Sequence, residues 1–210
     1  MTTRMLGLTA LAFACSLGAA GAQDATMSFF VTSANPGKGA DLGGVEGADA
    51  WCAGLAEAAG ATGKTWHAYL SSSGENARDR IGEGPWVNAK GETIAASLAA
   101  LHDENAPGLT KATALSEKGE VINGRGDTPN RHDILTGSLP DGTAAPETCG
   151  DWSMGGAEGA AIVGHSDRTG LDDSAPAKSW NSSHASRGGC SLEALRGTGG
   201  DGLLYCFAVD

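Results

Sequence analysis

Residues 203–209 read LLYCFAV, an apolar and aromatic run that carries Cys206. A short apolar run that follows glycine-rich chain predicts a buried strand. Working outward, the stretch GADAWCAGLA at 47–56 carries Cys52 and belongs to a segment, Val45 to Ala59, with apolar residues at helical spacing. We therefore expect a helix there whose Cys52 faces the core. The segment Met27 to Ser33 (MSFFVTS) predicts a further strand.

The beginning of the 210-residue chain is typical of an export signal, with Arg4, an apolar run from Met5 to Cys15 and small residues at Ala20-Gly21-Ala22. The run is too short to span a bilayer, which takes about 20 residues. We expect cleavage after Ala22, which leaves residues 23–210 as one domain. A lipoprotein signal at Cys15 is the alternative, but Phe13 stands where a small residue is needed.

Four cysteines remain after this cleavage, and an even set is typical of disulfides in an exported protein. We therefore expect a secreted or periplasmic protein without a membrane span. Four cysteines allow three pairings, and their positions alone do not choose between them. The four are Cys52, Cys149, Cys190 and Cys206.

The composition limits the partners and the fold. The formal net charge is −11 and no basic run opposes it, which excludes nucleic acid as a partner. The chain has 33 glycines and few aromatic residues, which argues against a helical bundle and favours long ordered loops.

The middle of the chain predicts only short elements. Thr65 to Ser71 alternates like a strand, Asn76 to Ile81 suits one helical turn, and Ile94 to Leu101 suits an amphipathic helix. Leu115 to Asn123 suggests a hairpin that turns at Lys118-Gly119. Residues 124–202 show no regular pattern, although their tryptophans and cysteines indicate that they pack.

These pieces, taken in order, carry a family resemblance. GADAWCAGLA (47–56), TWHAYLSSS (65–73), TCGDW (148–152), SWNSS (179–183) and LLYCF (203–207) resemble the C-type lectin-like family, in its endostatin-like branch and bacterial lectin-like relatives. The resemblance implies an α+β fold with small antiparallel sheets, one main helix and long ordered loops. It also implies two nested disulfides, Cys52–Cys206 and Cys149–Cys190.

The resemblance further implies a binding module for carbohydrate, with the loops from about 123 to 186 as the binding surface, and not an enzyme. Trp180 would stack on a sugar ring, while Asn181, Asp151 and His184 would bind hydroxyl groups. The alternative is a protein-binding or structural extracellular component that binds no sugar. A hydrolase would need a carboxylate pair, such as Asp151 with Asp133 or Glu147, and no spacing rule supports one.

Calcium is the cofactor that the resemblance suggests. The usual Glu-Pro-Asn or Gln-Pro-Asp tripeptide is missing, and Ser182 follows Trp180-Asn181 where an acid is expected. A different calcium site could draw on loop aspartates, because Ca²⁺ takes six to eight oxygen ligands. The candidates are Asp151, Asp167, Asp172 and Asp173, with Asp141 nearby in sequence.

Two further motifs have simpler interpretations. His132-Asp133, His165-x-Asp167 and His184 contain zinc-ligand residue types, but their spacing matches no zinc motif, so we expect surface or capping histidines. The string GRGD at 124–127 contains an integrin-recognition sequence, which we interpret as a chance match in an exposed loop.

Overall fold

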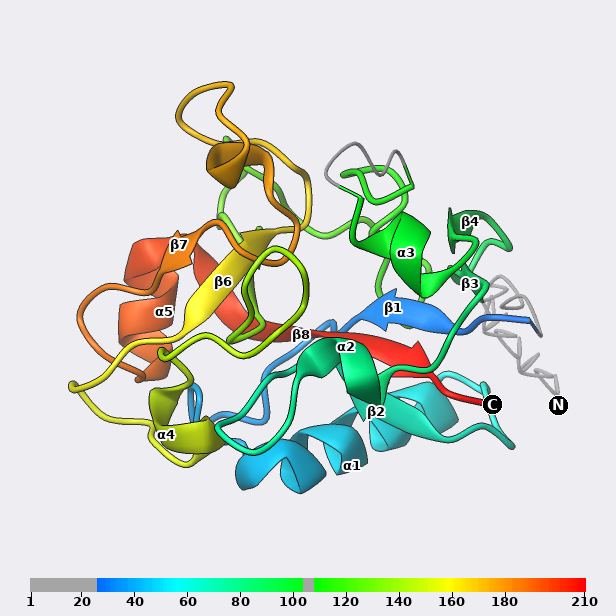
Figure 1. Cartoon of the computed structure of the whole chain (residues 1–210), viewed down its shortest axis with the longest axis horizontal. Helices are drawn as coiled ribbons and strands as arrows, with labels where there is room; N and C mark the ends of the chain where they lie inside the picture. Colours follow the sequence, from blue (N-terminus) through cyan, green and yellow to red (C-terminus); the bar gives the residue numbers. More distant parts are fainter. Residues whose placement is uncertain (1–25, 104–107) are drawn as a thin grey trace, which may run out of the picture.

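The computed structural model describes residues 26–103 and 108–210, so the predicted signal segment lies outside the described residues. The fold is mixed α+β, as expected, with one main helix, small sheets and two disulfides (Figure 1). Among the described residues, no helix is both long enough and apolar enough to cross a bilayer.

The strand β8 (Gly200–Ala208) is the centre of the six-stranded sheet, and all nine of its residues are buried. Its second half pairs antiparallel with β1 (Phe29–Val31) and β2 (Trp66–Ala68) on its two edges. Its first half pairs with β5 (Asp133–Leu135), and this pair is parallel, which corrects the expectation of purely antiparallel sheets. The strands β6 (Ile162–His165) and β7 (His184–Ala185) extend the sheet beyond β5.

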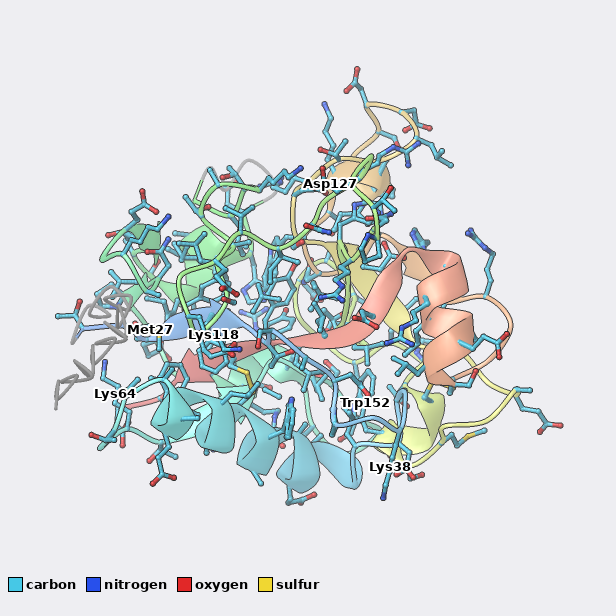
Figure 2. All side chains as sticks on the ribbon, turned by 180° about the vertical axis from the view of Figure 1, so that it is seen from behind. Met27, Lys38, Lys64, Lys118, Asp127 and Trp152 are labelled. Carbon is cyan, nitrogen blue, oxygen red and sulfur yellow. A yellow bond between two sulfur atoms is a disulfide. The ribbon has the colours of Figure 1, made fainter. Side chains whose placement is uncertain are left out.

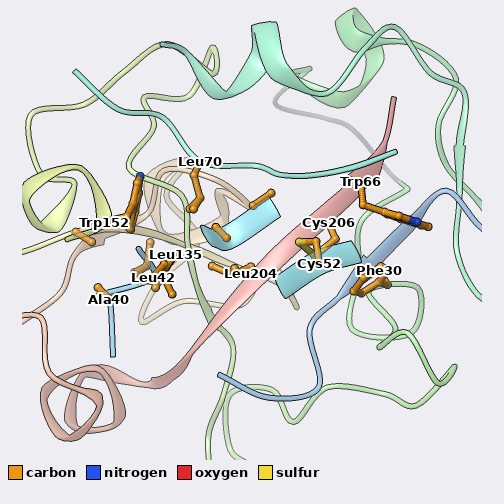
Figure 3. Close-up of a cluster of buried hydrophobic side chains, with 14 of the residues drawn as sticks. Phe30, Ala40, Leu42, Cys52, Trp66, Leu70, Leu135, Trp152, Leu204 and Cys206 are labelled. Carbon is orange, nitrogen blue, oxygen red and sulfur yellow. A yellow bond between two sulfur atoms is a disulfide. The ribbon is translucent and has the colours of Figure 1, made fainter. Parts of the chain in front are cut away.

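Successive side chains of β8 point to opposite faces of the sheet, so the hydrophobic core forms one cluster on each face. Leu204 and Cys206 face one cluster, which α1 (Gly44–Ala58) covers with Ala48, Cys52 and Ala56 (Figure 3). Leu203, Tyr205 and Phe207 face the other cluster, among aromatic side chains that include Phe29, Tyr69 and Trp86. The sequence therefore predicted both the buried strand and the helix that packs on it.

Both predicted disulfides are present. Cys52–Cys206 ties α1 to β8 across 154 residues, and Cys149–Cys190 spans 41 residues. All four cysteines belong to the cluster on the helix side of the sheet. Two disulfides are typical of proteins that fold in an oxidising compartment, which is consistent with secretion or export.

The smaller elements confirm some predictions and correct others. The expected helical turn is α2 (Ala77–Arg80), and the hairpin is reduced to a bridge between Leu115 and Val121. The expected helix over 94–101 was wrong in its first half, because β4 (Thr93–Ala95) pairs there with β3 (Trp86–Val87) and only α3 (Leu98–Leu101) is helical.

The region without a predicted pattern contains regular structure. Besides β5, β6 and β7 it holds α4 (Cys149–Trp152), the 3₁₀ helix η1 (Pro176–Lys178) and α5 (Leu192–Thr198). α4 is a left-handed turn, with φ of 49° at Cys149, 61° at Gly150, 53° at Asp151 and 65° at Trp152. Left-handed backbone costs non-glycine residues about 1–2 kcal/mol each, so neighbouring contacts must hold this turn in place.

Candidate metal centre

Register in the outer half of the sheet brings three polar side chains to one face. Asp133 begins β5 and lies directly opposite His165 at the end of β6. His184 on β7 lies opposite Val163, two residues before His165, and side chains two apart on a strand share a face. His132, which directly precedes β5, completes a group of four that we call the His₃Asp cluster.

The imidazole Nε2 atoms of the cluster surround the Asp133 carboxylate. The distance from Asp133 Oδ1 is 3.2 Å to His132 Nε2 and 3.4 Å to His165 Nε2. His184 Nε2 lies 3.7 Å from Asp133 Oδ2 and 3.1 Å from His165 Nε2. Two donors of a tetrahedral zinc ion, each about 2.0–2.1 Å from it, would lie about 3.3 Å apart. These four distances lie near that spacing.

The Asp133 carboxylate has no ordinary partner. Its side chain is 2% exposed, and neither oxygen accepts a hydrogen bond. On one side Gly199 packs closely against the carboxylate. A Cβ added at this glycine (φ +139°) would lie 3.1 Å from Oδ2. A buried carboxylate without compensation costs several kcal/mol, so the cluster calls for a cation.

Outer contacts orient each imidazole toward that carboxylate. His165 Nδ1 lies 2.8 Å from the carbonyl oxygen of Ala177, and His184 Nδ1 lies 3.1 Å from that of Ala185. His132 Nδ1 lies 2.9 Å from Asp167 Oδ1. Carbonyl and carboxylate oxygens only accept hydrogen bonds, so each Nδ1 donates. In a neutral ring the proton is then on Nδ1 and the Nε2 lone pair is left for a metal ion.

Asp167 links this cluster to the neighbouring loop. Burial opposes its ionisation, but hydrogen bonds from His132 and from the backbone N–H groups of Arg125 and Thr169 lower the pKa of Asp167 overall. A carboxylate behind a histidine is a common outer partner of metal ligands. At His165, burial lowers the pKa and favours the neutral form that binds metal.

One feature of the cluster requires a local adjustment. The rings of His132 and His165 are nearly parallel, with an interplanar angle of 8° and centroids 4.2 Å apart. The Nε2 lone pairs of two parallel, stacked rings cannot point at one ion. One of the two rings must therefore tilt for both histidines to bind the same ion. The rings of His165 and His184 are inclined by 65° and need less adjustment.

The chemistry of the donors favours Zn²⁺ or a similar transition-metal ion. Imidazole nitrogen with one carboxylate oxygen suits zinc, whereas Ca²⁺ takes six to eight oxygens. Within residues 26–103 and 108–210, His132, Asp133 and His165 form the one close group of at least three metal-ligating side chains. The expectation of surface or capping histidines is therefore wrong for His132 and His165, which are 4% and 5% exposed.

The four aspartates predicted to bind calcium do not form one group. Asp151 accepts from Ser73 and Thr148 and supports the left-handed turn, while Asp167 pairs with His132. Asp172 accepts from Ser174 N–H, and Asp173 pairs with Lys178.

The residues predicted to bind sugar have separate structural contacts. Trp180 is 3% exposed and donates to the carbonyl oxygen of Leu101, so its ring faces cannot both be open to a sugar. The amide nitrogen of Asn181 donates to Tyr69 Oη and to the carbonyl oxygens of Leu139 and Pro140. Asp151 supports the turn of α4. Of the four residues predicted to bind sugar, only His184 belongs to the His₃Asp cluster.

The GRGD loop is tied to the protein by its own aspartate. Asp127 pairs with Lys111 and accepts from Gly124 N–H. Figure 2 labels Asp127 at the end of the molecule where the loop after β6 projects. Both contacts engage Oδ2 while the Asp127 side chain stays 38% exposed, so the interpretation of GRGD as a chance match stays a prediction.

Comparison with known proteins gives no independent assignment, since no family model matches the chain and no curated protein matches it. The cluster must therefore be judged on its geometry. In the sequence, His132 and His165 stand at the ends of two short segments with apolar residues, HDIL at 132–135 and IVGH at 162–165. Segments of this length are too short to show the period of a strand or a helix.

Proposed function

We propose that this protein is an exported metal-binding protein, in which His132, Asp133, His165 and His184 hold one Zn²⁺ ion. The observation that carries the proposal is the Asp133 carboxylate, buried without a hydrogen bond among three imidazole Nε2 atoms. A divalent ion would neutralise this charge and join β5, β6 and β7.

The C-type lectin-like fold is part of the same proposal. It is supported by the disulfide between the main helix and the last strand, and by the second disulfide within the loop region. The metal would add a third cross-link, placed where β5, β6 and β7 are only two to four residues long.

Metal binding is tested by titrating Zn²⁺, Co²⁺ and Ca²⁺ into the chelator-treated protein with its disulfides intact, using calorimetry and metal analysis. We expect one Zn²⁺ or Co²⁺ per chain, no binding of Ca²⁺ at the same site, and loss of binding in His165→Ala. His67→Gln is the matched control, because His67 also lies beside an aspartate, with Nε2 4.0 Å from Asp49, but outside the cluster. Failure of Zn²⁺ and Co²⁺ to bind, or binding that survives His165→Ala, would refute the proposal.

Carbohydrate binding is the second candidate function, favoured by one cavity. It has a volume of about 580 Å³ and includes Trp180 and Asn181 in its lining, together with Pro140, Lys178 and Ser182. A glycan array with and without chelator tests this candidate. Binding of glycans that Lys178→Ala or Ser182→Ala abolishes would support it, and the absence of binding in both conditions would favour a protein partner.

A further inference from the structure

The four donors of the His₃Asp cluster differ sharply in their access to solvent. The side chains of His132, Asp133 and His165 are 4%, 2% and 5% exposed, whereas that of His184 is 35% exposed. The cluster therefore has three enclosed donors and one donor at the surface.

His184 is also held less firmly than the other histidines. It lies on β7, a strand of two residues at the edge of the sheet. Its Nδ1 contact is with the carbonyl of the adjacent residue, at 3.1 Å, so it does not fasten the ring to a distant part of the fold. By contrast, His165 is bound to η1 and His132 to Asp167, at 2.8 Å and 2.9 Å.

The distances from the imidazoles to the Asp133 carboxylate show the same difference. His184 Nε2 lies 3.7 Å from the nearest Asp133 oxygen in its ion-pair contact, compared with 3.2 Å and 3.4 Å for the other two imidazoles. A closed structural zinc site keeps four firm protein ligands, whereas a reactive site leaves one position to water or another small ligand. Three enclosed donors with a looser fourth resemble the second kind.

We propose that His184 is an exchangeable ligand, and that a small external donor, either an anion or an imidazole, can take its place on the metal. This inference rests on the proposed metal site. The incoming donor approaches from the solvent side of β7, while His132, Asp133 and His165 retain the ion. No bond other than the metal–ligand bond changes.

The test uses Co²⁺, whose visible absorption reports its ligands, in the full exported protein with both disulfides. Adding azide to the wild-type Co²⁺ protein should change the spectrum in a saturable way. His184→Ala should keep Co²⁺ with an affinity reduced by only about 10- to 100-fold, as small an effect as losing an outer-shell partner, because three enclosed ligands remain. Added imidazole should then restore a spectrum close to that of the wild type.

His165→Ala is the matched comparison, since it removes an enclosed ligand, and we expect it to lose Co²⁺ altogether. Thermal melts in chelator show whether each variant is folded. An unchanged wild-type spectrum at saturating azide, or loss of Co²⁺ in folded His184→Ala, would overturn the inference and leave metal binding intact. Absence of any Co²⁺ spectrum in the wild type would instead refute the metal site itself.

Discussion

Replacing Asp133 with asparagine should change stability in opposite directions with and without metal. In chelator the wild-type carboxylate is buried with no hydrogen bond, whereas an asparagine N–H₂ could donate to the Nε2 atoms of His132 and His165, 3.2 Å and 3.4 Å from Oδ1. One unsatisfied buried polar group costs about 1–3 kcal/mol. We therefore expect Asp133→Asn to be more stable than the wild type in chelator by at least about 1 kcal/mol.

Zinc should reverse this order. Zinc at a free concentration of about 1,000 times Kd would stabilise the wild type by about 4 kcal/mol. For a domain of this size that corresponds to a rise in Tm of about 8–16 °C. Asparagine supplies no negative charge to the ion, so the variant should gain much less and become the less stable protein.

The assay is thermal or urea unfolding of both proteins in chelator and in zinc. Asp201→Asn is the control, because the Asp201 side chain is also largely enclosed, at 9% exposed, but is paired with Arg196 at 2.6 Å and Arg131 at 3.2 Å. Its replacement should destabilise the protein by a similar amount in both conditions. If Asp133→Asn destabilised the protein equally in both, the cluster would hold a proton on its histidines, and the metal argument would fail.

Three further predictions follow from neighbouring contacts. Asp167→Ala should weaken zinc binding by about 10- to 100-fold, because His132 loses its outer partner, and Asp172→Ala, measured in the same titration, should leave it unchanged. Removing Cys149–Cys190 by a double change to alanine should cost up to about 4 kcal/mol for a loop of 41 residues, measured by urea unfolding, and a loss below about 1 kcal/mol would contradict this. Burial lowers the pKa of His102, whose Nε2 accepts from Tyr69 Oη. As the pH falls, His102 is therefore protonated in the unfolded chain before it is protonated in the folded protein. Stability in chelator should therefore fall as the pH drops below about 6.5, and the fall should be smaller in His102→Gln.

The sequence predicted those elements of the fold whose hydrophobic pattern is long enough to recognise. A continuous apolar run over 203–209 and helical spacing around Cys52 each extend over enough residues to be recognised. Around β5 and β6 the strands have three and four residues, so no period can appear, and they are strands because β5 pairs with β8 and β6 pairs with β5. A missed signal was SLEALRG at 191–197, where Ser191 caps α5 by accepting from Ala194 N–H.

The same reason explains the candidate site. Nothing in the spacing of His132, His165 and His184 resembles a metal motif, because sheet register, and not chain proximity, brings them together. The loop aspartates were predicted as ligands on their residue type alone. Local hydrogen bonds from Thr148 and Ser174 engage Asp151 and Asp172 instead, as is common for aspartates near turns.

The central position of β8 has a consequence for how the protein folds. Both strands that flank its second half come from the first third of the chain, and the bond from Leu204 N–H to Thr32 Oγ1 spans 172 residues. Contacts of such high order form slowly, because a long loop must close before they stabilise anything. The sheet cannot assemble until residues 200–208 are present, so the chain stays without its core during synthesis. Oxidation of Cys52–Cys206 waits for the same strand, because Cys206 lies on β8, so the covalent cross-link between the main helix and the sheet is among the last to form.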